Sequence, residues 1–172
     1  MQRGLIRAGD VTHALDGDQE AFSRLVVGCQ GTLYAAAMAI LRHEQDALDA
    51  VQDAILIGWR KLNTLRERRY FDTWMTRIVI RAAIDMRKKR RPAAALSEVA
   101  APDSPREEIL DIRRAMEALD ERTRLCAALY YYEGMSTDGV ARATGLRPGT
   151  VKSTLFRARN KLRTALEVWD DE

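Results

Sequence analysis

Cysteine, histidine and proline are scarce in this sequence, and their scarcity excludes several classes of protein. Of 172 residues, two are cysteine, two are histidine and four are proline. Cys29 and Cys126 lie far apart and form no CxxC pair, so we expect neither a zinc site nor a disulfide framework, and a reducing cytoplasm suits both thiols. His13 and His43 accompany no Cys cluster and no GxSxG motif. We therefore expect no metal, no cofactor and no triad hydrolase.

Long hydrophobic runs are also missing. Every apolar stretch is broken by Arg, Asp or Glu well short of the ~18 residues that a membrane-spanning helix needs. Residues 1–7 lack the apolar core of a signal peptide. Hydrophobic residues make up 47% and charged residues 31%, the balance of a soluble globular protein. Because β-branched runs are few, the sequence favours an all-α fold. The missing signal peptide and membrane span, with the two free thiols, lead us to expect a cytoplasmic location.

The net charge of +3 conceals an uneven distribution of charge along the chain. Residues 60–91 carry 12 basic and 3 acidic side chains, and residues 141–166 carry 7 basic and none acidic. Residues 1–59, 92–140 and 167–172 are net acidic. Two separate basic segments on an otherwise acidic chain indicate two surfaces that contact a polyanion, the alternative being well-solvated arginine-rich helices.

The chain divides into two helical domains. Three of the four prolines fall within residues 92–105, where the intervening alanine-rich stretch has no strong hydrophobic period. We expect a domain over residues 1–91, a flexible linker over residues 92–103, and a second domain over residues 104–172.

Helical periodicity marks the elements of the first domain. Residues 18–41 form an apolar run with a break near Gly28 or Gly31, and residues 44–63 form the next helix. Asp72 is the expected N-cap of a helix that runs to about Lys89. The predicted buried stripes of the last two helices are Leu48, Val51, Ile55, Trp59 and Leu62, and Trp74, Ile78 (or Met75), Ala82 and Met86.

The second domain opens with a capping box of Ser104 and Glu107, and Asp120 can cap the helix that Gly134 ends. A short helix over 136–144, a turn containing Gly145 and a long helix from Pro148 to about Leu166 then follow. This order and spacing predict a helix-turn-helix.

The last helix has the composition of a DNA-recognition helix. Val151, Leu155 and Ala158 begin its apolar stripe, and polar, basic and aromatic side chains lie off that stripe. Arginine can grip guanine O6 and N7, and an aromatic ring can touch a thymine methyl group. The alternative is a solvated basic helix on which Phe156 covers a hydrophobic edge. The candidates for DNA contact are Lys152, Ser153, Phe156, Arg157 and Arg159.

Two further groups of side chains suggest binding surfaces. Asp46, Asp49 and Asp53 share one helix face, which costs a few tenths of a kcal/mol in like-charge repulsion and either docks a basic partner or is simply solvated. The segment 66–91 interleaves aromatics with cations, as a surface for unstacked bases requires. Core packing is an alternative for its aromatic residues, above all for Trp74. The candidates in this segment are Arg66, Arg68, Tyr70, Phe71, Trp74, Arg77, Arg81, Arg87 and Lys88.

These motifs, in this order, resemble an extracytoplasmic-function (ECF) RNA polymerase sigma factor. Residues 17–22 look like the opening of sigma region 2, and residues 46–53 followed by Trp59 look like its core-polymerase-binding helix. Residues 71–75 and the basic run after Ile84 look like the part that binds the promoter −10 element. Residues 119–136 look like the start of sigma region 4, and residues 149–163 look like its −35 recognition helix.

The resemblance implies a dissociable specificity subunit without catalytic activity. It implies binding to core RNA polymerase, at the β′ coiled coil and the β subunit, and to promoter DNA, with melting of the −10 element. An anti-sigma factor is a further implied partner. It assigns Asp46, Asp49, Gln52 and Asp53 to the polymerase, and adds Thr150 to the −35 contacts.

Several positions depart from the family pattern. The family usually has Asn at the position of Arg81, Pro at that of Asp120 and Arg at that of Thr154. Arg81 alters the expected −10 preference, and Thr154 removes an expected phosphate contact. Gly139, where the family has Glu, weakens the first helix of the helix-turn-helix by roughly 1 kcal/mol relative to Ala.

Two other functions are compatible with parts of the sequence. A stand-alone helix-turn-helix regulator would explain the second basic segment but neither the first segment nor the acidic face. An all-α enzyme would need convergent acid–base or metal-binding residues, and the chain offers only His13 and His43 on different segments.

Overall fold

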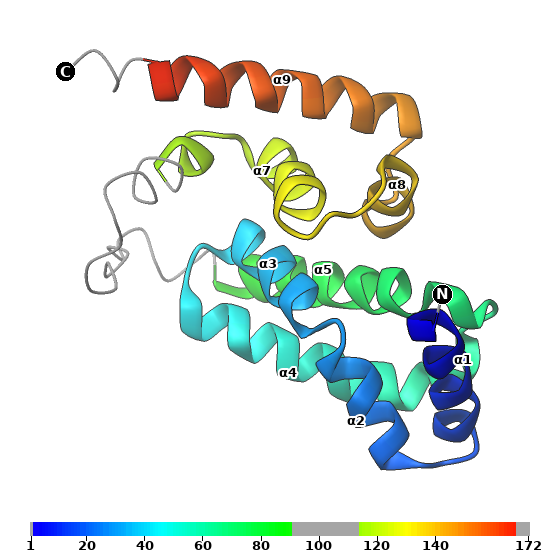
Figure 1. Ribbon diagram of the computed structural model, residues 1–172. Helices are drawn as coiled ribbons and strands as arrows, with labels where there is room; N and C mark the ends of the chain where they lie inside the picture. The colour runs from blue at the N-terminus through cyan, green and yellow to red at the C-terminus, as the bar shows by residue number, and fades with distance from the viewer. Residues whose placement is uncertain (1, 91–113, 168–172) are drawn as a thin grey trace. The chain divides into compact units, whose positions relative to one another are not determined.

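A computed structural model describes residues 2–90 and 114–167, which are mostly helical and contain no strand (Figure 1). The all-α prediction is therefore confirmed. The chain separates into two compact units, residues 1–92 and 93–172. The predicted linker, residues 92–103, and the Ser104–Glu107 capping box lie outside the described residues.

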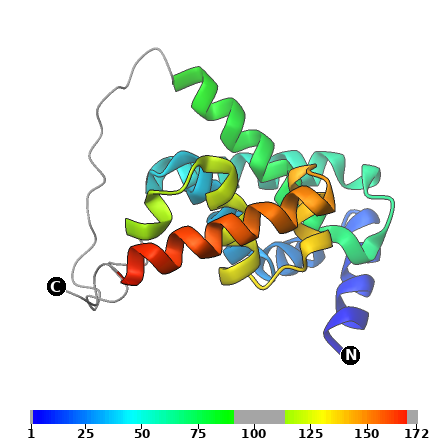
Figure 2. The same ribbon diagram turned by 90° about the horizontal axis from the view of Figure 1, so that it is seen from above.

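Unit 1 contains five α-helices and two short 3-10 turns within its described part. They are α1 (Gln2–Leu15), α2 (Gln19–Val27), α3 (Gln30–Leu41), α4 (Glu44–Lys61), η1 (Leu62–Thr64), η2 (Arg68–Tyr70) and α5 (Phe71–Arg90). Helices α3, α4 and α5 pack on one another, and α1 packs on α2 and on η2 (Figures 1 and 2). The chain breaks between α2 and α3 beside Gly28, as predicted, whereas α1 was not predicted.

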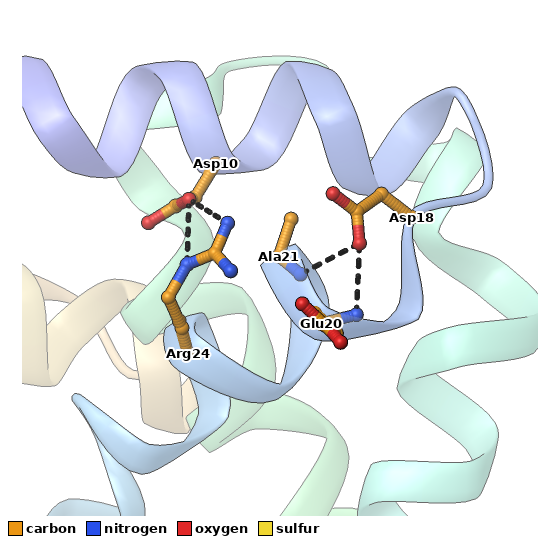
Figure 3. Close-up of polar contacts among 5 residues, drawn as sticks. All are labelled: Asp10, Asp18, Glu20, Ala21 and Arg24. Carbon is orange, nitrogen blue, oxygen red and sulfur yellow. Dashed lines mark hydrogen bonds and ion pairs between the residues drawn. The ribbon is translucent and has the colours of Figure 1, made fainter.

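Polar side chains fix the start of α2 and its contact with α1 (Figure 3). The Asp18 carboxylate accepts hydrogen bonds from the backbone N–H groups of Glu20 (2.9 Å) and Ala21 (3.1 Å), which caps α2. Arg24 donates from Nε (3.1 Å) and Nη2 (2.7 Å) to one oxygen of Asp10 on α1. These bonds hold α1 beside α2, where Val11 and Ala14 of α1 are buried.

The buried faces of α4 and α5 differ from the predicted stripes. On α4 the buried side is Asp46, Ala47, Ala50, Ala54 and Gly58, whereas Leu48 and Leu56 are exposed. On α5 the buried residues include Phe71, Met75, Val79 and Ala83. Small residues on α4 allow its neighbours to approach closely, so the helix turns its alanines inward and its larger side chains to the rim.

Helix α5 also begins earlier than predicted. It starts at Phe71 directly after η2, so Asp72 lies in its first turn instead of at its N-cap. The Thr76 hydroxyl donates a 2.7 Å hydrogen bond to the Asp72 carbonyl inside the helix.

Unit 2 contains the predicted helix-turn-helix. Its elements are α7 (Glu121–Ala127), a π-helical turn labelled η3 (Ala128–Tyr132), α8 (Thr137–Thr144) and α9 (Pro148–Glu167), and residues 114–117 are also helical. Asp120 caps α7 by accepting from the Thr123 N–H at 3.1 Å, as predicted. Helices α7 and α8 both pack on α9 (Figure 1).

The turn between α8 and α9 has the geometry that a helix-turn-helix requires. Ser136 caps α8 through the Gly139 N–H (3.0 Å), and Gly145 ends it with φ +76°, a left-handed conformation that favours glycine. Val151, Leu155 and Ala158 of α9 are buried, which confirms the first three positions of its predicted apolar stripe.

Within the described residues, no single helix is both long and apolar enough to cross a membrane, although α2 and α3, bent by 60°, meet these criteria as a pair by length and composition.

Candidate nucleic-acid interface

The exposed face of α9 carries the residues predicted to contact DNA. Lys152, Ser153, Arg157 and Arg159 are exposed, and Thr150 is half-buried. Phe156 is 60% exposed, which is unusual for a large apolar side chain and suits a contact made with a partner. The start of this helix therefore offers cations, hydroxyls and an aromatic ring on one accessible face.

Position 154 supports a neighbouring side chain instead of facing a phosphate. Thr154 is fully buried, and its Oγ1 accepts a 3.3 Å hydrogen bond from Arg157 Nη2. The sequence predicted that Thr154 removes a phosphate contact. In the structure, Thr154 makes a polar contact to Arg157 instead. Since Arg157 remains exposed, its guanidinium keeps further donors for a ligand.

Asp120 brings a negative charge close to the same cations. The Thr123 hydroxyl donates to its carboxylate at 2.7 Å and lowers the pKa of Asp120, and the positive charges of Lys161 and Arg157 lower this pKa further. The N-cap of α7 and the basic face of α9 are thus electrostatically linked.

The second cluster of cations and aromatic rings lies on the loop before α5 and on α5 itself. Arg66, Arg77, Arg81 and Lys88 are exposed, as a DNA-contacting role requires, and Arg87 is half-buried. Tyr70 and Trp74 are also half-buried, so both keep accessible ring surface.

Phe71 packs in the core, the alternative that the sequence left open for the aromatic residues, and Arg68 is bonded to α1. Phe71 is only 3% exposed and packs against the rings of Phe22 and Trp74, each with a centroid distance of 6.0 Å. Its predicted contact with DNA is wrong for this structure, because it is part of the core. Arg68 is exposed, but its Nη1 donates a 2.7 Å hydrogen bond to Thr12 Oγ1 on α1.

The acidic face of α4 is smaller than predicted. Asp46 is only 5% exposed, so it does not belong to an accessible face, and this part of the prediction is wrong. Asp53 and Gln52 are exposed, and Asp49 is half-buried and accepts a 3.1 Å hydrogen bond from Gln45 Nε2.

Two exposed leucines adjoin this acidic face and were missed by sequence reasoning. Leu48 is 41% exposed and Leu56 is 56% exposed. They lie four residues to either side of Gln52, so leucine, glutamine and leucine follow one line along α4. The sequence did contain a sign that these leucines are exposed. A second stripe of small residues has helical spacing as good as that of the predicted leucine stripe, and it consists of Ala47, Ala50, Ala54 and Gly58.

A third exposed group lies in unit 2. Tyr130, Tyr131 and Tyr132 of η3 are 37%, 47% and 57% exposed, and the first two rings meet edge to face at 5.0 Å. The π-helical turn shifts the register of this segment relative to an α-helix.

The thiols and acidic side chains form no metal-binding group in the described part of the chain. No three His, Cys, Asp or Glu side chains there are grouped so that they could hold a metal ion. Cys29 is buried, and burial raises the pKa of the Cys126 thiol to about 11. Cys126 is thus a protonated core side chain at neutral pH.

Comparison with known proteins identifies a family for both units. The family model for Sigma-70 region 2 matches residues 25–92, and the model for Sigma-70, region 4 matches residues 109–162. The ECF RNA polymerase sigma factor SigM of Mycobacterium tuberculosis is 33% identical, over 87% of this chain and 79% of that protein. The probable RNA polymerase sigma factor RfaY of Xanthomonas campestris is 34% identical over 91% of this chain, which spans only 43% of its length.

Solved structures agree on the fold. CnrH in complex with the cytosolic domain of CnrY matches with a TM-score of 0.75 and 28% identity, covering 95% of this chain and 98% of that one. The sigma factor RpoE of Bartonella quintana, in complex with the anti-sigma factor NepR, matches with a TM-score of 0.73 and 24% identity, covering 86% and 97%.

Proposed function

Because this chain belongs to the ECF RNA polymerase sigma factors, we propose that its two units read two elements of one promoter while α4 docks on core RNA polymerase. The chain then directs the polymerase to specific promoters and starts transcription by recognising the −35 and −10 elements and melting the latter. The observation that carries this proposal is the pairing of a basic, partly aromatic helix-turn-helix in one unit with a basic, aromatic segment in the other.

Unit 2 is the −35 reader. Its α9 has Lys152, Ser153 and Phe156 exposed near the helix start, where a recognition helix meets base edges in the major groove. Arg157 and Arg159 follow on the accessible side and supply donors for guanine or for phosphate.

Unit 1 is the −10 reader. Opening this element unstacks bases, and an unstacked base needs a flat ring to lie against and cations for its phosphates. The half-buried rings of Tyr70 and Trp74 supply the flat surface, and the cations are Arg66, Arg77 and Arg81. Arg81 presents donors only, so it favours a guanine or a phosphate over the adenine edge that an Asn can pair.

Helix α4 is the docking element for the β′ coiled coil of the polymerase. Its outer face combines the exposed Leu48 and Leu56 with the polar Asp49, Gln52 and Asp53. Apolar side chains supply burial on association, and the carboxylates supply complementarity to basic residues. The β subunit is the expected contact of unit 2, where the exposed tyrosines of η3 provide aromatic surface.

Regulation by an anti-sigma factor is part of the proposal. It is supported by the likeness to CnrH, whose structure was solved with the cytosolic domain of CnrY. We place the chain in the cytoplasm, without a catalytic role or a cofactor, since its work is to bind polymerase and DNA.

The experiment that tests this function is run-off transcription with purified core polymerase on a promoter library. The chain should confer promoter-specific transcripts that core polymerase alone does not make. A chain that produced no specific transcript, yet protected duplex DNA without polymerase, would be a stand-alone regulator instead.

Charge reversal on α4 tests the docking face separately. Asp49→Lys combined with Asp53→Lys should leave the melting temperature near that of the wild type, because surface changes usually alter stability by within about 0.5 kcal/mol. Its affinity for core polymerase, measured by fluorescence anisotropy, should fall by several-fold. The matched control is Asp16→Lys with Asp85→Lys, which changes the net charge of unit 1 equally at other exposed positions. Equal affinities for the two double variants would contradict the docking role.

A further inference from the structure

Helix α1 contacts two different parts of unit 1 through side chains that are close together in sequence. Asp10 accepts both donors of Arg24 on α2 (Figure 3), while Thr12 accepts a 2.7 Å hydrogen bond from Arg68 Nη1 in η2. Between them, Val11 is fully buried. Helix α1 is therefore held on α2 and is at the same time bonded to the loop that precedes α5.

The loop over residues 62–70 has few internal bonds that could fix its position. The backbone hydrogen bonds within it are local, from the Leu65 N–H to the Leu62 carbonyl (3.0 Å) and from the Tyr70 N–H to the Glu67 carbonyl (2.9 Å). Such bonds shape a turn but do not tie it to the rest of the domain. The buried side chains of Leu62 and Leu65 anchor the first part of the loop in the core. The Thr12–Arg68 hydrogen bond ties its second part to α1, and its partners are 56 residues apart in sequence.

The three arginines of this loop have different surroundings. Arg68 is bonded to Thr12, and Arg69 lies over the Tyr70 ring at 4.8 Å, with its Nε 3.4 Å from a carboxylate oxygen of Glu67. Arg66 is exposed and makes no hydrogen bond or ion pair with another described residue. A cation that is already engaged within the fold is less available to a phosphate than one that is not.

We propose that Arg68 is a positioning residue, which sets the place of the 66–70 loop by bonding to Thr12 of α1, and that Arg66 is the phosphate-contacting arginine of this loop. The inference rests on the proposed −10 role of unit 1 and deepens it. Helix α1 thereby contributes to promoter opening without touching DNA, because it fixes the loop that carries Arg66 and Tyr70.

Variants of Thr12 test the positioning role. Thr12→Val removes the hydroxyl at nearly constant shape, Thr12→Ala is a second removal in case the first disturbs packing, and Thr12→Ser restores the acceptor. In holoenzyme assembled with core polymerase, the open-complex fraction at limiting promoter is read from permanganate reactivity of −10 thymines. We expect Val and Ala to lower the equilibrium constant for opening by about threefold to tenfold, the scale of one ordinary solvent-exposed hydrogen bond, and Ser to restore it.

Two further measurements separate positioning from direct DNA contact. If Arg68 acts through Thr12, Arg68→Ala should match Thr12→Val, the double variant should be no worse, and the salt dependence of DNA binding should keep its slope. Arg66→Ala, the matched control on the same loop, should reduce that slope by about one. Tryptic cleavage after Arg66 in the free chain should be faster in Thr12→Val than in Thr12→Ser, because the loop is released.

Opposite results overturn the inference in a recognisable way. Normal opening by Thr12→Val, together with a reduced salt slope in Arg68→Ala, would make Arg68 itself the phosphate contact. Additive defects in the double variant would also contradict a shared role. If instead Arg66, Arg68 and Thr12 variants all opened promoters normally while core binding was intact, the proposed −10 role of this loop would be wrong.

Discussion

At the scale of single residues, Asp120 joins helix capping to the basic charge of α9. Its carboxylate accepts from both the N–H and the hydroxyl of Thr123, and it feels the positive charges of Lys161 and Arg157. All of these stabilise the ionised form, so the pKa of Asp120 is lower in the folded chain than the ordinary value of 3.8.

The ionised Asp120 carboxylate therefore contributes to the free energy of unfolding, and this contribution is lost when acid protonates it. Because the unfolded chain binds this proton more readily, the contribution is fully present above pH ~4 and is lost as the pH falls through the lowered folded-state pKa. Asp120→Ala should cost about 1 kcal/mol at neutral pH, the usual value of an N-cap, and Asp120→Asn should cost less, since the amide oxygen still caps α7.

Urea unfolding of the wild type and of Asp120→Asn, followed by circular dichroism across an acid pH series, checks this expectation. The difference in unfolding free energy between the two should shrink as the pH falls. A difference that stayed constant between about pH 6 and about pH 3 would show that the charge of Asp120 contributes nothing.

Some residue roles could be predicted from the sequence because they depend on neighbours only a few positions away. Asp120 is a helix cap, and a cap needs only an acceptor side chain and the N–H groups that follow it. Phe71 and Asp46 were assigned wrongly because their burial depends on helices that are distant in sequence. The hydrogen bond from Arg68 to Thr12 could not be predicted, since nothing local to Arg68 reveals a partner 56 residues away.

At the scale of elements, Gly58 sets the distance between α4 and α5. A Cβ atom added there would lie 2.5 Å from Met75 Sδ, 3.0 Å from Met75 Cε and 3.6 Å from Phe22 Cζ. Met75 is fully buried, so its flexible side chain has little room to move away. The glycine therefore allows the two helices to pack closely at a cost in helix propensity.

This packing predicts that the effect of Gly58→Ala on stability changes sign when Met75 is replaced by alanine. In the wild type, Gly58→Ala should destabilise unit 1, because overpacking costs about 1–3 kcal/mol and outweighs the gain of about 1 kcal/mol in helix propensity. In a Met75→Ala background, the same substitution should stabilise by up to about 1 kcal/mol.

Thermal unfolding of the four chains of this double-mutant cycle measures the coupling. Gly9→Ala on α1 is the matched control, since a Cβ there would meet nothing within 4 Å. It should stabilise in both backgrounds. Destabilisation by Gly58→Ala irrespective of residue 75 would mean that Met75 is not the obstacle.

The same small residues explain why the buried faces of two helices were predicted incorrectly. The leucine stripe of α4 and its alanine stripe both have helical spacing, and hydrophobicity favours the leucines. The structure buries the alanines, because three helices pack closely there, and leaves Leu48 and Leu56 exposed. Periodicity identifies a helix reliably, whereas the choice of its buried face depends on its neighbours.

At the scale of the whole molecule, the chain contains two separate hydrophobic cores. Leu33, Met75 and Val79 are fully buried in unit 1, and Leu129 and Val140 are fully buried in unit 2. The two-domain, all-α character could be predicted, because proline placement and helical periodicity are properties of the sequence alone. Helix α1 could not be predicted, since its sequence has only a short amphipathic pattern that contains two glycines.

Two cores predict two cooperative unfolding units. Leu33→Ala should lower the stability of unit 1 by about 2–5 kcal/mol, and Leu129→Ala should do the same for unit 2, because each leaves a cavity where a leucine had no exposed surface. Amide hydrogen exchange followed by mass spectrometry assigns the loss. Leu33→Ala should speed exchange in α3, α4 and α5 while α8 and α9 keep the wild-type rate, and Leu129→Ala should give the reverse.

Because each unit holds its own proposed DNA-binding surface, Leu33→Ala should also weaken −10 opening by holoenzyme while −35 footprints persist. Accelerated exchange in both units from either substitution would show one cooperative fold, in which promoter reading by the two units could not be separated.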